Sequence, residues 1–273
     1  MLEDTIAFVL ENIKKTFGMV LVTGPTGSGK TTTLYSILNI LNRPEVNIVT
    51  VEDPIEYDMK YINQTQINPA SGITFASGLR AIVRQDPNIV LVGEIRDEET
   101  ADISVQAALT GHLVLSSLHT NDAPTAVPRL IDMRIPAFLV AAVLNIIIAQ
   151  RLVRRICVNC ITSYELSDEM REVIKKQMTE LKLILEGNLP KLLYKGVGCP
   201  ICGFTGYKGR LAIYEVLNVN ESIRKIIISE NFSLDQLKEE ARKNGMMTMF
   251  EDGLRKAERG MTTIEEILRV IKE

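Results

Sequence analysis

Residues 19–41 read MVLVTGPTGSGKTTTLYSILNIL, and this stretch decides the fold. Met19–Thr23 is a continuous apolar run, as expected for a strand that is buried on both faces. Thr31–Leu41 is predicted to be a helix, and the turn between them matches the phosphate-binding pattern G-x-x-x-x-G-K-[ST]. A strand, a glycine-rich loop and a helix in this order predict an α/β domain that binds a nucleoside triphosphate.

The residue type at each position of this loop suits phosphate binding. Its glycines let backbone N–H groups point at phosphate oxygens, and the following helix presents its positive N-terminal end to the same anion. Lys30 places a positive charge near the β- and γ-phosphates, and the Thr31 hydroxyl can complete a Mg²⁺ shell. A chance glycine turn is the alternative, but the strand and helix around the loop argue against it. The candidate ATP-binding residues here are Gly24, Pro25, Thr26, Gly27, Ser28, Gly29, Lys30, Thr31 and Thr32.

Strand and helix patterns alternate through the first half of the chain, which predicts a largely parallel sheet. Residues 2–15 have apolar positions close to helical spacing. Further strands are expected at Asn47–Val51, Ile89–Val92 and Leu113–Ser117, with helices at Phe75–Arg84 and Glu98–Leu109.

Two acidic positions follow predicted strands and suit catalysis beside a triphosphate. Glu94 follows Ile89–Val92, where it would bind Mg²⁺ through water or polarise the attacking water. A surface glutamate after a strand is the alternative. Glu52, Asp53 and Glu56 form a second cluster, and at least one of them is a candidate general base.

Composition excludes several classes of protein. The chain has 273 residues, 46% hydrophobic and 24% charged, so it can form a sizeable core and is not disordered. Its net charge of −3 argues against broad nucleic-acid binding. The longest apolar run, Ala137–Ala149, is too short to span a membrane and is predicted to be a buried helix. Residues 1–10 carry acids where a signal peptide needs basic residues, so we expect a cytoplasmic protein.

The four cysteines form two C-x-x-C pairs that are 38 residues apart, Cys157 with Cys160 and Cys199 with Cys202. This spacing is typical of a tetrahedral Cys₄ zinc site, which leaves no open position and would be structural. Core thiols, a redox pair or an iron–sulfur cluster are the alternatives.

The second half of the chain is expected to be mainly helical around these cysteines. Asp168–Leu185 is predicted to be a charged helix, Gly196–Gly209 a loop-rich segment, and the chain from Glu221 onward helical. Ser233 with Gln236 and Thr263 with Glu266 fit capping boxes. The predicted division is a core at residues 1–155, a tetracysteine subdomain at 156–210 and a helical region at 211–273.

Six segments together resemble the secretion-superfamily ATPases, the hexameric motors of type II secretion and type IV pilus assembly. The resemblance runs from about Phe17 to the C-terminus. It is carried by GPTGSGKTTT (24–33), TVEDPIEY (50–57), GLRAIVRQDPNIVLVGEIRDEET (78–100), TGHLVLSSLHTND (110–122), AQRLVRRIC (149–157) and GCPICGFTGYKGRLAIYEVL (198–217).

The resemblance assigns roles to single residues. In TVEDPIE the last acid, Glu56, corresponds to the catalytic base, and Glu94 corresponds to the Walker B glutamate that acts with Mg²⁺. His112 and His119, the two histidines of the chain, match the histidine box at the two ends of one strand, where His119 would sense the γ-phosphate and His112 would contact ATP. A structural role for these histidines is the alternative.

The resemblance also implies a neighbouring subunit. Arg80 and Arg84 lie four residues apart on one predicted helix face, and they match arginines that reach the nucleotide of the next subunit. A solvated helix face is the alternative. Complete members of the family carry a further N-terminal domain before the motor domain, whereas about 16 residues precede the P-loop strand here. We therefore expect a motor domain from a longer protein or an incomplete gene product.

The resemblance implies a RecA-like P-loop core followed by a zinc-stapled C-terminal region. The expected function is an ATPase motor subunit, a hexamer that acts at the inner membrane through a platform protein, with Mg²⁺ and structural Zn²⁺ and no nucleic acid. A retraction or DNA-transfer motor of the same superfamily is an alternative, although retraction motors typically lack the cysteines. A nucleotide-dependent regulatory module without turnover is another, against which Glu56 and Glu94 argue.

Overall fold

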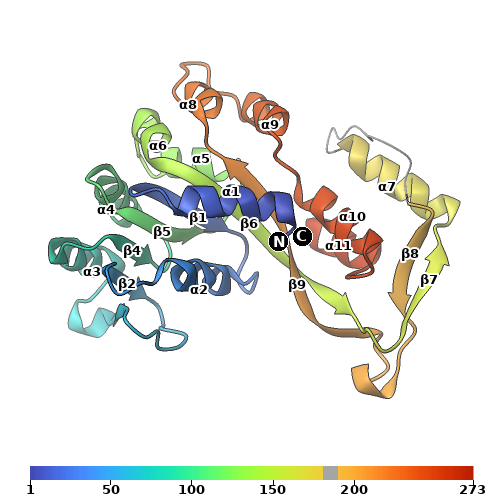
Figure 1. Cartoon of the computed structure of the whole chain (residues 1–273). Helices are drawn as coiled ribbons and strands as arrows, with labels where there is room; N and C mark the ends of the chain where they lie inside the picture. Colours follow the sequence, from blue (N-terminus) through green and yellow to red (C-terminus); the bar gives the residue numbers. More distant parts are fainter. Residues whose placement is uncertain (181–189, 273) are drawn as a thin grey trace. The chain divides into compact units, whose positions relative to one another are not determined.

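The computed structural model describes residues 1–180 and 190–272, which fall into two units (Figure 1). The first unit contains Met1–Arg151 and Tyr214–Met249, and the second contains Leu152–Ile213 and Phe250–Glu273. The chain therefore leaves the first unit after Arg151 and returns to it at Tyr214.

A sheet built from buried apolar runs organises the first unit. In the described part of the chain, strands pair in the order β3-β2-β4-β5-β1-β6-β9, and all pairs from β3 to β6 are parallel. Every residue of β1, β2, β4 and β5 is buried, which explains why these strands are continuous apolar runs in the sequence. The strands are β1 (Gly18–Thr23), β2 (Ile48–Glu52), β3 (Asn63–Gln66), β4 (Ile89–Val92), β5 (Leu113–Leu118), β6 (Leu144–Ile156) and β9 (Tyr207–Asn218).

Helices cover both faces of this sheet. Helices α1 and α2 share one core with alternate strand residues such as Val20 and Val22 of β1. Helices α3, α4 and α6 contact strands of the same sheet, and their described residues lie outside that core, so they cover the opposite face. The helices are α1 (Glu3–Ile13), α2 (Lys30–Leu41), α3 (Phe75–Ile82), α4 (Glu98–Leu109), α5 (Ala126–Asp132), α6 (Ala137–Val143), α8 (Glu221–Ile227) and α9 (Leu234–Lys243).

Among its described residues, the second unit combines a two-stranded sheet with three α-helices. Strands β7 (Ile161–Glu165) and β8 (Leu192–Gly196) pair antiparallel. Helices α7 (Asp168–Glu180), α10 (Met249–Glu258) and α11 (Ile264–Lys272) share a core with β8, in which Ile174, Leu193, Phe250 and Ile264 are at most 1% exposed. A short 3₁₀ helix, Pro200–Cys202, carries the second cysteine pair.

Most elements expected in the first half are present. β4 and α4 have the predicted bounds. Asp97 is the N-cap residue of α4, and its side chain accepts a hydrogen bond from the Thr100 N–H at 2.8 Å. The predicted helix Phe75–Arg84 is wrong at its end, because α3 ends at Ile82 and Arg84 lies in the 3₁₀ turn Val83–Gln85. Ser233 caps α9 by accepting a hydrogen bond from the Gln236 N–H, which is one half of the predicted capping box.

The prediction of one buried helix over Ala137–Ala149 is wrong in its second half. The helix α6 ends at Val143, and β6 follows directly and pairs with β1. The physical reason is the β-branched run Ile146–Ile148, which fills a buried strand position beside β1. The strands β3, β7, β8 and β9 were also not predicted. The last residues of the predicted helix Asp168–Leu185 lie outside the described residues.

Within residues 1–180 and 190–272, none of the helices combines the length and the apolar character that a membrane crossing requires.

Candidate functional site

The candidate nucleotide site lies at one edge of the parallel sheet. Because β1, β2, β4 and β5 run parallel, their carboxyl ends lie along the same edge. Ligands of open α/β sheets bind at this edge. The segments that follow the four strands are the P-loop after Thr23, the acidic turn after Glu52, Glu94 after Gly93, and His119 after Leu118.

The P-loop has the backbone shape that its glycines predict. Gly29, the residue before α2, has φ 89°, a left-handed conformation that favours glycine. A Cβ atom on Gly24 would lie 2.4 Å from the carbonyl oxygen of Gln150, so a side chain does not fit there. Pro25, Thr26 and Thr32 are exposed, Ser28 is buried, and Lys30 and Thr31 are half-buried.

Lys30 lies over the loop that it belongs to. Its Nζ donates hydrogen bonds to the carbonyl oxygens of Gly24 at 2.9 Å and Pro25 at 3.1 Å. Burial lowers the pKa of Lys30, and the negative charge of Glu94 opposes this effect. The opposite charges of Lys30 and Glu94 therefore influence each other across this edge of the sheet.

Gln150 on β6 is a buried side chain that holds the P-loop, and this role was not predicted from the sequence. Its side-chain amide donates to the carbonyl oxygen of Ser28 at 2.7 Å, and its amide oxygen accepts from the Thr33 hydroxyl at 2.7 Å. Gln150 is 1% exposed, so these bonds are protected from water. The available signal was an amide side chain directly after the apolar run IIIA (146–149).

Glu94 lies between a histidine and an arginine. Its side chain is 13% exposed and forms an ion pair with Arg96. Its Oε2 lies 3.3 Å from His119 Nε2. The structure thus places Glu94 beside His119, and these residues and the P-loop follow the ends of three neighbouring strands, β4, β5 and β1.

The three acids at the end of β2 and in the turn after it differ in their surroundings. Glu52 is 2% exposed, and its carboxylate accepts hydrogen bonds from Tyr35 Oη, from the Thr50 hydroxyl at 2.6 Å and from Gln64 Nε2 at 3.2 Å. With these partners, the Glu52 carboxylate is suited to hold Tyr35 and Gln64 in place rather than to transfer a proton. Asp53 and Glu56, by contrast, are exposed.

Tyr35 connects the P-loop helix to Glu56. The Glu56 N–H donates to Tyr35 Oη at 3.4 Å, and the rings of Tyr35 and Tyr57 meet edge to face at 4.8 Å. Burial and the Glu52 carboxylate raise the pKa of Tyr35, so its hydroxyl stays protonated. Sequence reasoning had treated this residue only as a part of helix α2.

The remaining predicted residues are His112, Arg80 and Arg84. His112 precedes β5, at the opposite edge of the sheet from His119, and its Nδ1 lies 2.8 Å from the carbonyl oxygen of Ala107. Arg80 pairs with Glu99, and both side chains are more than half exposed. Arg84 is also exposed. The structure does not bring His112 to the P-loop of its own chain.

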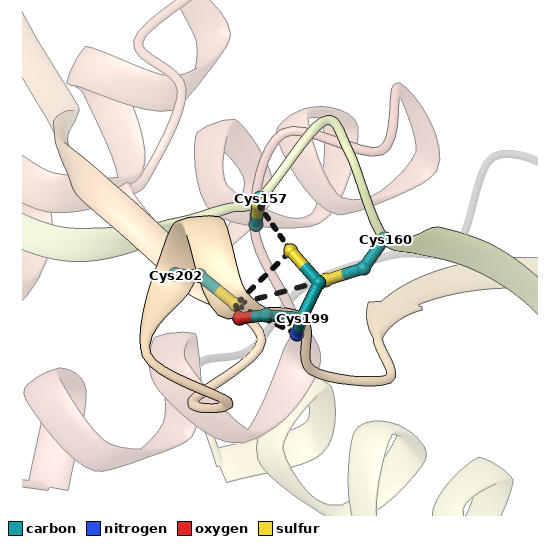
Figure 2. A group of neighbouring side chains, drawn as sticks. All are labelled: Cys157, Cys160, Cys199 and Cys202. Carbon is teal, nitrogen blue, oxygen red and sulfur yellow. Dashed lines mark hydrogen bonds between the residues drawn. The ribbon is translucent and has the colours of Figure 1, made fainter.

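The four cysteines of the second unit form one cluster (Figure 2). All four Sγ atoms lie within 4.8 Å of one another. The Sγ–Sγ distances are 3.9 Å for Cys157 with Cys199, 3.9 Å for Cys160 with Cys202 and 3.7 Å for Cys199 with Cys202. Sulfurs placed tetrahedrally at about 2.3 Å from a zinc ion would be about 3.8 Å apart. The cluster therefore has the donor set and the spacing for a tetrahedral metal ion.

Backbone N–H groups favour a thiolate in this cluster. Burial opposes the ionisation of Cys202, but hydrogen bonds from the N–H groups of Cys199 at 3.2 Å and Gly206 at 3.3 Å, together with the neighbouring thiols, lower its pKa to about 6. The thiolate is the form that binds a metal.

Comparison with known proteins gives a consistent result. Residues 1–269 match the family model described as "Type II/IV secretion system protein". The chain is 50% identical to the type II secretion system ATPase E of Vibrio cholerae over 261 residues, which cover 96% of this chain and 50% of that protein. It is 50% identical to the type IV pilus assembly ATPase PilB of Thermus thermophilus over 258 residues, 94% of this chain and 28% of that protein. The chain thus spans half or less of the length of these relatives.

Solved structures show a similar fold. The pilus retraction motor PilT with bound ADP matches with a TM-score of 0.70 and 29% identity, over 99% of this chain and 64% of that one. The ATPase DotB of Legionella pneumophila matches with a TM-score of 0.68 and 24% identity, over 99% and 63%. Both likenesses support the mixed α/β fold with its parallel sheet.

Proposed function

We propose that this chain, which belongs to the type II/IV secretion system protein family, is the ATP-hydrolysing part of a motor for type II protein secretion or type IV pilus assembly. One observation carries the proposal: a complete P-loop and the acidic residues Glu56 and Glu94 follow parallel strands that end at the same edge of one sheet. The names of the two relatives at 50% identity support it.

ATP binds at the P-loop in this proposal. The backbone N–H groups of the loop and the N-terminal end of α2 face the phosphates, and Lys30 moves its charge from the loop carbonyls to the β- and γ-phosphates. Thr31 and Glu94 would hold Mg²⁺, which neutralises charge on the phosphate oxygens when it is bound.

Glu56 is the proposed general base for the attacking water. Its exposure and its place after β2 support this role, whereas Glu52 is buried and accepts three hydrogen bonds. His119, beside Glu94, is the proposed sensor of the γ-phosphate. His112 lies at the other edge of the sheet, so we do not propose an ATP contact for it within its own chain.

Assembly completes the site in this proposal. Arg80 and Arg84 are exposed, and the ion pair of Arg80 with Glu99 is exposed and therefore weak, which suits contact with the nucleotide of a neighbouring copy in a hexamer. Such a ring would act on an inner-membrane platform protein. The likeness to PilT keeps a retraction motor as the second candidate within the same superfamily.

Zinc is the proposed ion of the cysteine cluster. Cys157, Cys160, Cys199 and Cys202 would bind it, with no position left for substrate. When bound, the ion links the segment before β7 to the segment after β8. Its role is therefore structural, and no chemical step at the nucleotide site depends on it.

The test of the ATPase proposal is the variant Glu56→Gln. Loss of a general base typically lowers the rate by about 10²–10⁴-fold, so we expect ATP to bind normally while hydrolysis nearly stops. Asp58→Asn, an exposed acid of the same loop, is the matched control. Full turnover by Glu56→Gln together with inactive Glu94→Gln would exchange the two roles, and absence of ATP turnover at any protein concentration would refute the proposal.

A further inference from the structure

The loop that begins at His119 is built around one aspartate. In the histidine loop, residues 119–125, the carbonyl oxygen of Asp122 accepts hydrogen bonds from the hydroxyls of Thr120 at 2.9 Å and Thr125 at 3.1 Å. The Asp122 side chain also accepts from the Thr125 N–H at 2.9 Å. The loop therefore behaves as one unit, and His119, beside Glu94, is its first residue.

Two later elements of the first unit hold this loop. Glu215 on β9 is 6% exposed, and its Oε1 accepts a hydrogen bond from the Ala123 N–H at 2.9 Å. Lys238 on α9 donates to Asp122 Oδ2 at 2.7 Å. Two adjacent loop residues are thus fixed by side chains that lie 92 and 116 positions away in the sequence.

We propose that Glu215 is a positioning residue for the nucleotide site: by holding Ala123, its carboxyl group fixes the histidine loop and with it the place of His119 relative to Glu94. Lys238 completes this arrangement through Asp122. The proposal rests on the proposed function in one respect, that His119 acts during ATP hydrolysis. Glu215 meets the loop through the Ala123 N–H, so its effect reaches the nucleotide through His119.

The surroundings of Glu215 make this support depend on pH. Burial raises the pKa of Glu215 to about 7, and the negative charge of Asp122 adds to the rise. Hydrogen bonds from the backbone of Ala123 and Met249, and the positive charge of Lys238, act in the opposite direction. The charged carboxylate is the stronger acceptor for the Ala123 N–H. The hydrogen bond from the Ala123 N–H to Glu215 therefore becomes stronger as the pH rises through about 7.

The experiment compares Glu215→Met, Glu215→Gln and the unaltered full chain. Glu215→Met keeps the length of the side chain but removes the acceptor. We expect the turnover number for ATP to fall by about ten- to a hundredfold while KM changes less than twofold, because the P-loop is untouched. Glu215→Gln keeps an acceptor and should regain most of this loss, but without the rise in rate around pH 7. Lys243→Met, an exposed lysine on the same helix as Lys238, should leave turnover unchanged.

Nuclear magnetic resonance provides a readout that does not depend on hydrolysis. The Ala123 amide proton should shift with a midpoint near pH 7 in the unaltered chain and should show no such step in Glu215→Gln. Hydrogen exchange in residues 119–125 should be faster in Glu215→Met. If the shift persists in Glu215→Gln, or if exchange and turnover in Glu215→Met match the unaltered chain, the proposal is overturned. If the unaltered chain does not hydrolyse ATP, the proposed function fails, and the amide data alone decide whether Glu215 holds the loop.

Discussion

The nucleotide edge of the first unit and the cysteine cluster of the second unit are built in opposite ways. The P-loop is one run of consecutive residues, and its phosphate-binding groups are mostly backbone N–H groups placed by β1 and α2. The cluster joins two pairs of side chains separated by 38 residues. The fold itself therefore shapes the first site, whereas the proposed zinc ion would contribute to the folding of the second.

The largest expected effect follows removal of the metal. Treatment with a chelator, or the variant Cys199→Ser, should release zinc and open the second unit, because structural zinc sites contribute about 10–16 kcal/mol in small zinc-dependent domains. Hydrogen exchange should rise first in residues 152–213, while ATP affinity, measured by calorimetry, stays unchanged.

The control for this variant is Val158→Ser, which alters a side chain between Cys157 and Cys160 that is 67% exposed and is not one of the four candidate ligands. A folded, zinc-free protein with four reduced thiols would refute the zinc site. Loss of ATP affinity in Cys199→Ser would show that the two sites are not independent, and the contrast between them would fail.

A smaller effect is expected when the charge of the P-loop is removed. Lys30→Ala should raise the Kd for ATP by about 10- to 100-fold, because a hydrogen bond to a charged group contributes about 1.5–3 kcal/mol. Zinc content and the thermal stability of the second unit should not change. Titration calorimetry with Lys14→Ala, an exposed lysine, as the control measures the difference, and unchanged affinity in Lys30→Ala would sink the assignment of the nucleotide site.

The smallest effect is expected at Gln150. Gln150→Leu removes the donor to Ser28 and the acceptor for Thr33, so we expect about a three- to tenfold weaker affinity for ATP and a modest loss of stability. Gln106→Leu, on the exposed side of α4, is the control. If Gln150→Leu binds ATP as tightly as the unaltered chain, β1 and α2 position the P-loop without the hydrogen bonds from Gln150.

Some parts of the nucleotide site could be predicted from the sequence, and others could not. The P-loop, β4 and α4 followed from local patterns, and the place of Glu94 followed from the strand pattern before it. The contact of His119 with Glu94 was not predicted. The strand β6 was also not predicted, because a short buried apolar run has no period that separates a helix from a strand. Because β6 was not predicted, the hydrogen bonds of Gln150 to the P-loop and α2 were not predicted either; they depend on the position of β6 beside β1.

The sequence by itself determined the nucleotide-binding loop, the acids that follow neighbouring strands and the C-x-x-C spacing, because each of these is encoded by residues close together in the chain. The tertiary structure alone decided which of the acids after β2 is buried and which is exposed, since hydrogen bonds from Tyr35 and Gln64 surround Glu52 and leave Glu56 open to water. It also decided that Glu215 meets Ala123 and that Gln150 meets Ser28. These contacts join positions roughly a hundred residues apart, and only the packing of strands and helices brings such positions within hydrogen-bond distance.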